Sequence, residues 1–326
     1  MKALALFSGG LDSMLAIKLI TMQNIEVLAL NMNIGFGSRI DISELMKERA
    51  KMAGADFEII DVRDYYLKNI LFEPKFGYGK NFNPCIDCHG FMFKTARELL
   101  DTYGASFLIT GEVVGQRPMS QRSDALKSVQ KLAGDEEGLI LRPLSAKIMD
   151  PTKPEVEGWV DREKLLGISG RSREIQLSLA KKFGWDDFEK PGGGCLLTDI
   201  NFTKKIRDFI AHDNMSVEDI DILKNGRHLR LPDGAKLIIG RDKEENERIE
   251  NIQVTKYIFL KATQIPGPSS LISKNATKED LELAARIILT FAKTEKEKEY
   301  EVRVGDNIIK AKPFESRNEI YKYFIT

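Results

Sequence analysis

The chain has 326 residues, of which 42% are hydrophobic and 30% are charged. This composition is typical of a soluble globular protein, and it excludes an intrinsically disordered chain. No apolar run approaches the roughly 20 residues that a membrane-spanning helix needs, so we expect a cytoplasmic protein without a membrane partner. The 49 basic and 49 acidic residues balance, so net charge alone does not indicate a nucleic-acid partner.

The first half of the chain alternates strand and helix patterns. Apolar runs typical of strands lie at residues 3–7, 25–32, 57–61, 106–110 and 139–141. Segments with helical periodicity lie at residues 11–22, 41–53, 91–103 and 121–132. Strands separated by helices predict βαβ units, and therefore an α/β fold with a doubly wound parallel sheet.

The second half has a different order of elements. Helices are predicted at residues 201–212, 217–224 and 279–292, and strands at 235–240, 257–262 and 300–304. Before them, residues 190–195 contain three successive glycines and predict a loop. We therefore expect two domains, residues 1–200 and a smaller α+β domain over residues 201–326.

The sharpest motif lies between the first predicted strand and the first predicted helix. It consists of Ser8, Gly9, Gly10, Leu11, Asp12 and Ser13. Glycines there let backbone amides turn toward an anion, and the helix N-terminus adds the positive end of its dipole. The two serine hydroxyls can donate to phosphate oxygens, whereas the Asp12 carboxylate suits a Mg²⁺ ion bridging it to phosphates. The motif favours a nucleotide site over a simple glycine turn with a capping serine.

This string resembles the SGGxDS signature of the PP-loop ATP pyrophosphatases. Enzymes of that superfamily cleave ATP between the α- and β-phosphates and adenylate a substrate oxygen. The resemblance implies ATP and Mg²⁺ as cofactors and Asp12 as a catalytic residue. It also implies that the ATP contacts include Ser8, Gly9, Gly10, Asp12 and Ser13.

Two further stretches indicate the acceptor. The run Thr110-Gly-Glu-Val-Val-Gly-Gln116 with Ser120-Gln121, and the later Leu141-Arg-Pro-Leu144, resemble the TGExxGQ…SQ and LRPL stretches of the tRNA 4-thiouridine synthetase family. The resemblance implies Gly111 and Gln121 as ATP contacts. Asn31, at the end of the second predicted strand, is assigned to the same nucleotide pocket.

The cysteines form a second signal. Asn83-Pro-Cys85-Ile-Asp-Cys88 resembles the NPCxxC motif of the tRNA 2-thiouridylases. In those enzymes, and in the archaeal 4-thiouridine synthetases, a CxxC pair works with one distant cysteine, which in this chain is Cys195. The chain has three cysteines in all, and the resemblance implies that all three are catalytic.

Two arrangements of Cys85, Cys88 and Cys195 can supply sulfur. In the first, the three thiolates are the metal ligands of a [4Fe–4S] cluster, whose fourth iron has no protein ligand. In the second, Cys195 carries a persulfide that the pair resolves, which favours a thiol pKa lowered by a helix N-terminus. A zinc site with His89 or Asp87 as fourth ligand is a third alternative. The presence of both members of the pair and the distant cysteine favours the cluster.

The C-terminal half carries a weaker motif series. Gly226-Arg-His-Leu-Arg230, Gly240-Arg-Asp242, Glu245-Asn246 and Pro266-Gly-Pro268 resemble the RNA-binding domain of the NFACT family. The basic residues expected to contact RNA phosphates are Arg227, Arg230, Arg241 and Lys261. A solvated basic edge on a purely structural domain is the alternative.

These patterns together predict an ATP-dependent tRNA sulfurtransferase that adenylates a uridine oxygen, releases AMP and pyrophosphate, and replaces the oxygen with sulfur. TGExxGQ and LRPL favour 4-thiouridine at position 8, whereas NPCxxC favours 2-thiouridine at the anticodon. The expected partners are tRNA and a sulfur donor, either sulfide or a cysteine desulfurase-type carrier, and a homodimer is compatible with the sequence. A small-molecule amidating or adenylating enzyme and a non-enzymatic RNA-binding factor remain alternatives.

Overall fold

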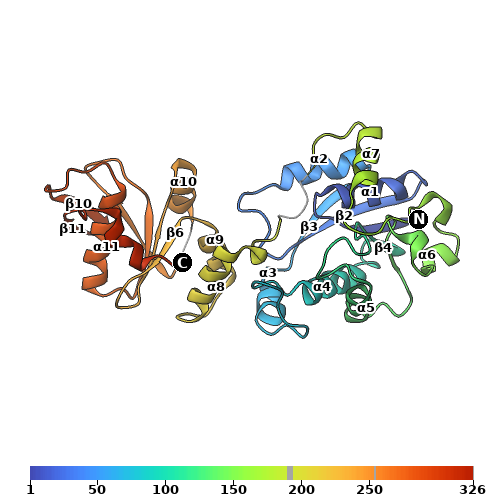
Figure 1. The fold of residues 1–326 in the computed structure, drawn as a ribbon, viewed down its shortest axis with the longest axis horizontal. Helices are drawn as coiled ribbons and strands as arrows, with labels where there is room; N and C mark the ends of the chain where they lie inside the picture. Colours follow the sequence, from blue (N-terminus) through green and yellow to red (C-terminus); the bar gives the residue numbers. More distant parts are fainter. Residues whose placement is uncertain (189–193, 253–254, 326) are drawn as a thin grey trace. The chain divides into compact units, whose positions relative to one another are not determined.

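The computed structural model describes residues 1–188, 194–252 and 255–325. The chain folds into two compact units, Met1–Thr198 and Asp199–Thr326, whose ribbons are drawn in Figure 1. The division falls two residues before the boundary that we place from the sequence. Of the predicted glycine loop, residues 190–193 lie outside the described residues.

The first unit is built around a parallel sheet. Its strands are β1 (Lys2–Leu6), β2 (Glu26–Asn33), β3 (Asp56–Asp61), β4 (Phe107–Thr110) and β5 (Ile140–Leu141). Its helices and helical turns are α1 (Leu11–Thr21), α2 (Ser43–Ala53), α3 (Arg63–Tyr66), η1 (Leu67–Leu71), α4 (Cys85–Glu98), α5 (Ser123–Leu132), η2 (Ala146–Ile148), α6 (Lys153–Val156), η3 (Arg162–Lys164), α7 (Glu174–Lys182) and η4 (Leu196–Thr198). Within the described ranges, the strands pair in parallel in the order β3-β2-β1-β4-β5. The predicted doubly wound α/β fold is confirmed.

Helices cover both faces of this sheet. In Figure 1, α1, α2 and α7 lie on one face, and α4 and α5 lie on the other. The central strands are therefore apolar on both sides, as Ala3, Leu4, Ala29 and Leu30 show by being fully buried. The edge strand β3 is mostly half-exposed or exposed.

The order of the strands determines where a ligand binds. From β1 the chain passes through α1 to β2 and β3 on one side, whereas β4 and β5 lie on the other side of β1. In open parallel sheets, ligands bind outside the carboxyl ends of the strands at the point where the strand order reverses. The loop after β1 lies at this point, next to the end of β4.

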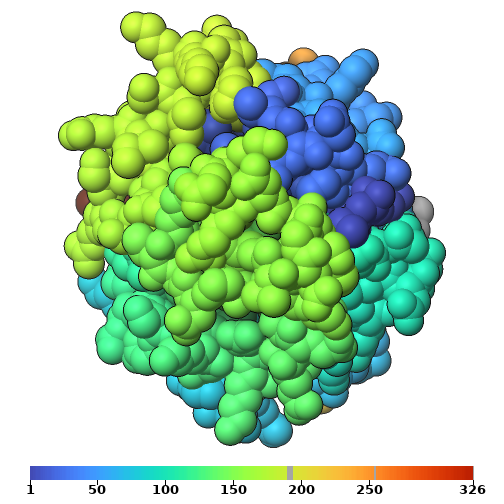
Figure 2. All heavy atoms as spheres, turned by 90° about the vertical axis from the view of Figure 1, so that its right-hand side faces the viewer, coloured from blue at the N-terminus to red at the C-terminus, as the bar shows by residue number. Residues whose placement is uncertain are grey.

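The chain after β5 returns across the first unit. Figure 2 shows this segment, coloured yellow-green, on one face of the unit beside the N-terminal segment in blue. The two segments are joined where the backbone N–H of Asp161 donates to the side chain of Gln23 at 2.8 Å. This return places α7 against α1.

The second unit contains an antiparallel sheet. Its strands are β6 (Arg227–Arg230), β7 (Lys236–Ile239), β8 (Tyr257–Ala262), β9 (Ser270–Ser273), β10 (Tyr300–Val304) and β11 (Asn307–Ala311). Its helices are α8 (Ile200–Ile210), α9 (Val217–Lys224), α10 (Lys243–Asn251), α11 (Lys278–Phe291) and the 3-10 helix η5 (Arg317–Tyr323). In the described part of this unit the strand order is β11-β10-β8-β9-β7-β6. The predicted separate α+β fold at the C-terminus is confirmed.

Two apolar layers hold this sheet between helices. Leu237 and Ile239 of β7 belong to the cluster that buries α11 residues such as Ile288. Ile238, which points to the opposite face because strand side chains alternate, packs with Ile222 of α9 and its neighbours from α10. No helix within the described ranges is both long and apolar enough to cross a membrane.

Candidate active site

The loop between β1 and α1 has the backbone of an anion site. Gly9 has φ +73°, a conformation that side chains other than glycine rarely adopt, and Arg49 from α2 donates to its carbonyl oxygen at 3.2 Å. Gly10 is the N-cap of α1, and no side chain caps the first turn. The Ser13 hydroxyl donates to the Gly10 carbonyl at 2.8 Å, whereas Ser8 is exposed. The uncapped helix N-terminus is the feature that binds phosphates in such loops.

The end of β4 lies against this loop. A Cβ atom added at Gly111 would lie 2.4 Å from the backbone nitrogen of Ser13 and 2.5 Å from the backbone carbon of Asp12. No side chain fits at this distance, so glycine is required for the backbones to meet. Gly111, predicted from the resemblance, therefore lies at the nucleotide loop.

Asp12 is held by residues from two other segments. Its Oδ2 accepts a hydrogen bond from the Gln116 side chain at 2.7 Å, and Arg173 Nη2 lies 3.5 Å from Oδ1. The Gln116 side-chain oxygen accepts in turn from Gln176 of α7 at 2.9 Å. Our sequence reasoning missed Arg173 and Gln176. The signal available for Arg173 was a basic residue after Gly170, at the start of a helical segment.

Asn31 and Gln121 lie beside the same loop. The Asn31 side chain donates to the carbonyl of Phe7, the residue before Ser8, at 3.0 Å. The Gln121 carbonyl accepts from the Gly115 amide at 2.7 Å. The Gln121 side chain is buried, and its amide oxygen has no hydrogen-bond partner in the described part of the chain. A buried acceptor without a partner is costly, so the Gln121 oxygen is an unsatisfied group of the fold.

The CxxC pair lies in the first turns of α4. The helix begins at Cys85 rather than at the predicted residue 91, because the sequence after Pro84 continues the helix without interruption. In βαβ units the helix before a strand starts at the carboxyl edge of the sheet, so α4 places the pair at the same edge as the loop after β1. Asn83 donates its side-chain amide to Cys85 Sγ at 3.1 Å.

Cys195 is brought to this edge from the end of the first unit. The amide of Leu196, the next residue, donates to the Phe36 carbonyl in the loop after β2 at 2.8 Å. Two residues further along η4, the carbonyl of Thr198 accepts from the Asn81 side chain at 2.5 Å. Asn81 lies four residues before Cys85. These bonds fix the chain around Cys195 to the segments beside the pair.

The three thiols interact electrostatically with one another. Burial raises the pKa of Cys88 far above its usual range, and the charges of Cys195 and Cys85 raise it further. Burial also raises the pKa of Cys195 to about 11, with a further increase from Cys85. The expectation of a thiol pKa lowered at a helix N-terminus is therefore wrong for Cys88, because burial is the largest effect on its pKa.

A buried tyrosine, which our sequence reasoning missed, lies among the thiols. Tyr66 is fully buried, and its hydroxyl lies within hydrogen-bond reach of the Cys88 thiol but has no partner of regular geometry among the described residues. Burial raises the pKa of this hydroxyl, and the charges of Cys88, Cys195 and Cys85 raise it further, so all three thiols lie within its reach. It belongs to a short helix after β3, where nothing in the sequence distinguishes it from a core aromatic.

Arg117 connects the thiols to the nucleotide motif. It is exposed and lies one residue after Gln116, and its charge lowers the pKa of Cys195 against the effect of burial. The segment that holds Asp12 therefore also reaches Cys195. The three cysteines and the predicted ATP contacts thus belong to one region of the first unit.

The two residues considered as a fourth zinc ligand have other partners. The Asp87 carboxylate accepts from the backbone amides of Lys75 and Phe76 at 2.9 and 3.0 Å. His89 Nδ1 lies 2.9 Å from Glu112 Oε1. Among residues 1–188, 194–252 and 255–325, no group of three or more His, Cys, Asp or Glu side chains is arranged to hold a metal ion.

Glu112 is the centre of a buried charged cluster. Burial raises its pKa, but Arg142 and then His89 outweigh burial and hold the pKa below its usual value. The Arg142 side chain donates to Glu112 Oε2 at 3.0 Å. Glu112 belongs to TGExxGQ and Arg142 to LRPL, so the two motifs meet in one ion pair beside Cys88.

The four predicted RNA contacts are spread over the second unit and mostly neutralised. Arg230 is paired with Asp208 at 2.7 Å, Lys261 with Glu250 at 2.5 Å, and Arg241 with Glu245. Arg227 donates to the Gly240 carbonyl at 3.2 Å and has no ion pair in the described residues. The structure thus leaves Arg227 without a carboxylate partner and gives the other three one each.

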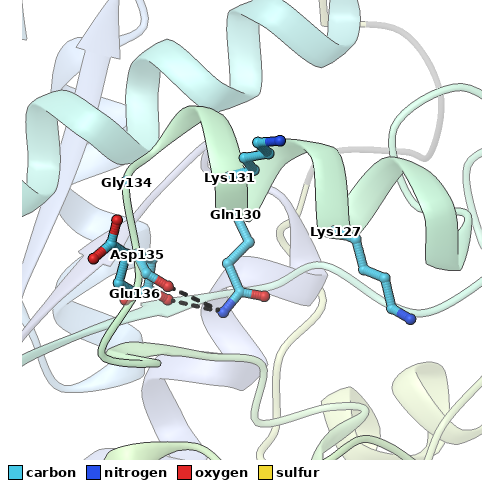
Figure 3. A pocket seen from close by; sticks show the side chains of 6 residues that line it. All are labelled: Lys127, Gln130, Lys131, Gly134, Asp135 and Glu136. Carbon is cyan, nitrogen blue, oxygen red and sulfur yellow. Dashed lines mark hydrogen bonds between the residues drawn. The ribbon is translucent and has the colours of Figure 1, made fainter.

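One pocket of the first unit lies outside this region. It has a volume of about 260 Å³ and is lined by Lys127, Gln130, Lys131, Gly134, Asp135 and Glu136. Figure 3 shows the Gln130 side chain directed at Asp135, to which it donates at 3.4 Å. Asp135 also accepts from the amide of Leu139 at 2.7 Å. These bonds position the chain before β5, so the pocket has a structural explanation.

Two family models match the chain. Residues 2–75 match the N-terminal HUP domain of argininosuccinate synthase, and residues 226–324 match the NFACT protein RNA binding domain. Among curated proteins, the tRNA-specific 2-thiouridylase MnmA of Petrotoga mobilis is 31% identical over 127 residues, covering 34% of this chain and 35% of that protein. The first family match lies within the first unit of the chain, and the second lies within the second unit.

Two further comparisons are with proteins whose names refer to sulfur transfer to tRNA or to 4-thiouridine. A "Probable tRNA sulfurtransferase" of Thermococcus kodakarensis is 24% identical over 178 residues, covering 54% of this chain and 42% of that protein. The chain therefore spans less than half the length of these two curated relatives. A solved 4-thiouridine synthetase–RNA complex with bound ATP has 19% identity and a TM-score of 0.39, and the match covers 56% of this chain and 40% of that one. That score is too low to support a conclusion about function.

Proposed function

We propose that this PP-loop protein is an ATP-dependent tRNA sulfurtransferase that produces 4-thiouridine at position 8. The observation that supports the proposal is that hydrogen bonds from Leu196 to Phe36 and from Asn81 to Thr198 hold the chain next to Cys195 against the segments beside the CxxC pair, in the same unit as the loop after β1. A PP-loop enzyme that amidates a small molecule has no use for this set of thiols. The relatives named as tRNA thiolation enzymes and the RNA-binding domain match support tRNA as the substrate.

In the first step, the loop after β1 binds ATP with the uncapped N-terminus of α1 toward the phosphates. The Asp12 carboxylate fits a Mg²⁺ ion, because its two oxygens accept only two hydrogen bonds and retain lone pairs for a hard cation. The uridine oxygen attacks the α-phosphorus, its new O–P bond replaces the bond to pyrophosphate, and the ring N3 proton is lost. Arg173 lies beside Asp12, where a guanidinium offsets the charge of the departing pyrophosphate.

In the second step, sulfur replaces the activated oxygen. Hydrosulfide, from sulfide or from a desulfurase-type carrier, attacks the ring carbon, and AMP leaves with the oxygen. The hydrosulfide proton restores the N3 proton, so the thiouridine product is neutral. In this proposal, Cys85, Cys88 and Cys195 deliver the sulfur.

These cysteines suit a [4Fe–4S] cluster as ligands. Soft thiolates are the ligands that such clusters take, and three of them leave one iron without a protein ligand. In the described residues the three thiols are not arranged as a metal-binding group, so the proposal requires Cys85, Cys88 and Cys195 to converge when a cluster is bound. When bound, the cluster would present its free iron to the transferred sulfur.

The test of the function is the nucleoside content of tRNA from cells with and without the protein, measured by mass spectrometry. We expect 4-thiouridine to disappear and 2-thiouridine to remain. Complementation with the wild-type chain should restore 4-thiouridine, and complementation with Asp12→Asn should not. Unchanged levels of both nucleosides would refute the proposed function.

The second candidate is a 2-thiouridylase acting at the anticodon. The 31% identity to a tRNA-specific 2-thiouridylase favours it, as does the NPCxxC sequence. Loss of 2-thiouridine with retention of 4-thiouridine in the same experiment would select this function. The adenylation chemistry and the roles of the cysteines are the same for both products.

The cluster and the persulfide are distinguished by anaerobic purification. We expect a brown protein with iron and acid-labile sulfide, and each of Cys85→Ala, Cys88→Ala and Cys195→Ala should bleach it. A colourless anaerobic preparation that retains full activity would exclude the cluster and favour a persulfide on Cys195.

A further inference from the structure

Three arginines of the second unit lie over aromatic rings. The guanidinium carbons of Arg227 and Arg317 each lie 5.2 Å from the centre of the Phe291 ring. The guanidinium carbon of Arg286 lies 4.0 Å from the centre of the Phe314 ring. These distances are within the range of cation–π contacts. The five residues form what we call the arginine–aromatic surface.

The parts of this surface adjoin. The backbone amide of Phe314 donates to the hydroxyl of Thr290, the neighbour of Phe291, at 2.9 Å. The end of α11, the segment before η5 and the start of β6 therefore meet at one place. The Phe324 ring lies 6.5 Å from Phe291 and 5.9 Å from Tyr321, whose side chain is 60% exposed. Tyr321 thus extends the surface with an accessible ring.

The positive charge of the surface is not neutralised. None of Arg227, Arg286 and Arg317 forms an ion pair with a carboxylate of the described residues, whereas the neighbouring acids have other partners. Glu245 pairs with Arg241, Glu315 lies 3.6 Å from Lys296, and Glu319 caps η5 by accepting from the Ser316 amide at 3.1 Å. Burial and the charges of Arg241 and Arg317 lower the pKa of Arg227, whereas Glu245 and Asp242 raise it. These acids offset part of the Arg227 charge, so the unneutralised charge of the surface rests mainly on Arg286 and Arg317.

We propose that the arginine–aromatic surface binds RNA, with Arg286 and Arg317 contacting backbone phosphates and Tyr321 stacking on an unpaired base. Unneutralised guanidinium groups beside exposed rings are the combination that single-stranded nucleic acids recognise. The segment that matches the RNA-binding domain, residues 226–324, contains all these residues. The inference deepens the proposed function and rests on it, because it assigns the contacts that hold tRNA.

The surface is tested by RNA binding of the full chain. Fluorescence anisotropy measures the affinity for a tRNA transcript and for a short oligouridine at several salt concentrations. The variant Arg286→Gln/Arg317→Gln removes two exposed charges, and Tyr321→Ala removes the ring. Arg303→Gln on β10 is the matched control, because it removes an exposed arginine from a strand separated from β6 by β8, β9 and β7.

We expect the double variant to bind both RNAs at least about tenfold more weakly and to lower the salt dependence by about two phosphate contacts. Tyr321→Ala should weaken oligouridine binding, and Arg303→Gln should bind like the wild type. The proposal that this surface binds RNA would be refuted if the double variant bound RNA as tightly as the wild type. It would also be refuted if the control variant were weakened as much as the double variant. Wild-type binding to oligouridine through this surface without thiolation of any tRNA would instead refute the proposed function and leave the surface standing.

Discussion

At the scale of single residues, the site depends on positions where one atom decides what fits. Gly111 is the clearest case, because its missing side chain is what allows the end of β4 to reach the nucleotide loop. Tyr66 is the opposite case, because one hydroxyl atom is buried without a regular partner where phenylalanine would pack equally well. Neither role is visible in a propensity or a hydrophobic pattern.

Gly111→Ala should abolish nucleotide binding. The new Cβ would lie 2.4 Å from the Ser13 nitrogen, so the loop must move, at a cost of about 1–3 kcal/mol in the free energy of unfolding. Calorimetric titration with a non-hydrolysable ATP analogue measures the binding. Gly37→Ala is the control, because a Cβ there meets nothing within 4 Å. Undiminished binding by Gly111→Ala would show that the loop does not need this approach.

Tyr66→Phe should affect tRNA thiolation without lowering the stability of the fold. The hydroxyl lacks a regular partner, so its removal should leave the free energy of unfolding unchanged or raise it by about 1 kcal/mol. If the hydroxyl donates to sulfur during transfer, thiolation should fall while AMP formation continues. Denaturant unfolding and thiouridine analysis measure the two effects. A large loss of stability with unchanged thiolation would mark Tyr66 as a structural residue.

At the scale of elements, the sequence predicted the presence of the helices and strands of the first unit better than the residues at which they begin and end. The apolar runs of β1, β2 and β4 were identified because buried parallel strands are apolar on both faces, and β3 was identified from its own apolar residues although it is an exposed edge strand. The start of α4 was missed because two cysteines and an acid resemble a loop, although Asp87 instead caps the preceding amides. Strand β6 was missed because Arg-His-Leu-Arg has only one aliphatic residue.

The sequence identified the residues of the motifs but not the side chains that contact them. Resemblance to family motifs gave Asp12, Gly111 and the cysteines as candidates, and the parallel topology brings the ends of β1 and β4 and the start of α4 to one edge of the sheet. The resemblance could not supply Arg173 or Gln176, which reach Asp12 through a long return of the chain. Nor could it show that most of the basic strip is ion-paired, because Asp208 lies 22 residues before its partner Arg230.

Arg230→Gln should therefore weaken the fold more than RNA binding. Asp208 accepts from both Arg230 and the buried Lys236, whose pKa burial lowers to about 8. Loss of Arg230 leaves this network incomplete and should cost about 1–3 kcal/mol. Thermal unfolding measures the cost, and the salt dependence of tRNA binding should not change. A reduced salt dependence with unaltered stability would show that Arg230 contacts phosphate directly.

At the scale of the whole molecule, each unit has its own core, so we expect two unfolding transitions. An ATP analogue should stabilise only the first unit. Its free energy of unfolding should rise by about 2.7 kcal/mol when the analogue is at a hundredfold excess over its dissociation constant. Differential scanning calorimetry with and without the analogue measures both transitions. A single transition that shifts as a whole would show that the units unfold together.

Lowering the pH should lower the temperature at which the second unit unfolds. Burial holds the pKa of His228 well below its usual value of 6.5, so the folded chain keeps it neutral while the unfolded chain protonates it. Stability from this residue is complete above pH 6.5 and falls below it, by at most about 1.4 kcal/mol per pH unit. His228→Leu should flatten the dependence between pH 6.5 and 5. An unchanged slope in that variant would assign the acid sensitivity to other groups.

The ion pair between Glu112 and Arg142 has a consequence for how such chains diverge. Each residue belongs to a different motif, yet neither charge is tolerable in the interior without the other. A lineage that replaced one of them would keep a stable protein only by replacing the other within the same evolutionary step or soon after. The two positions, 30 apart in the sequence, are therefore expected to change together.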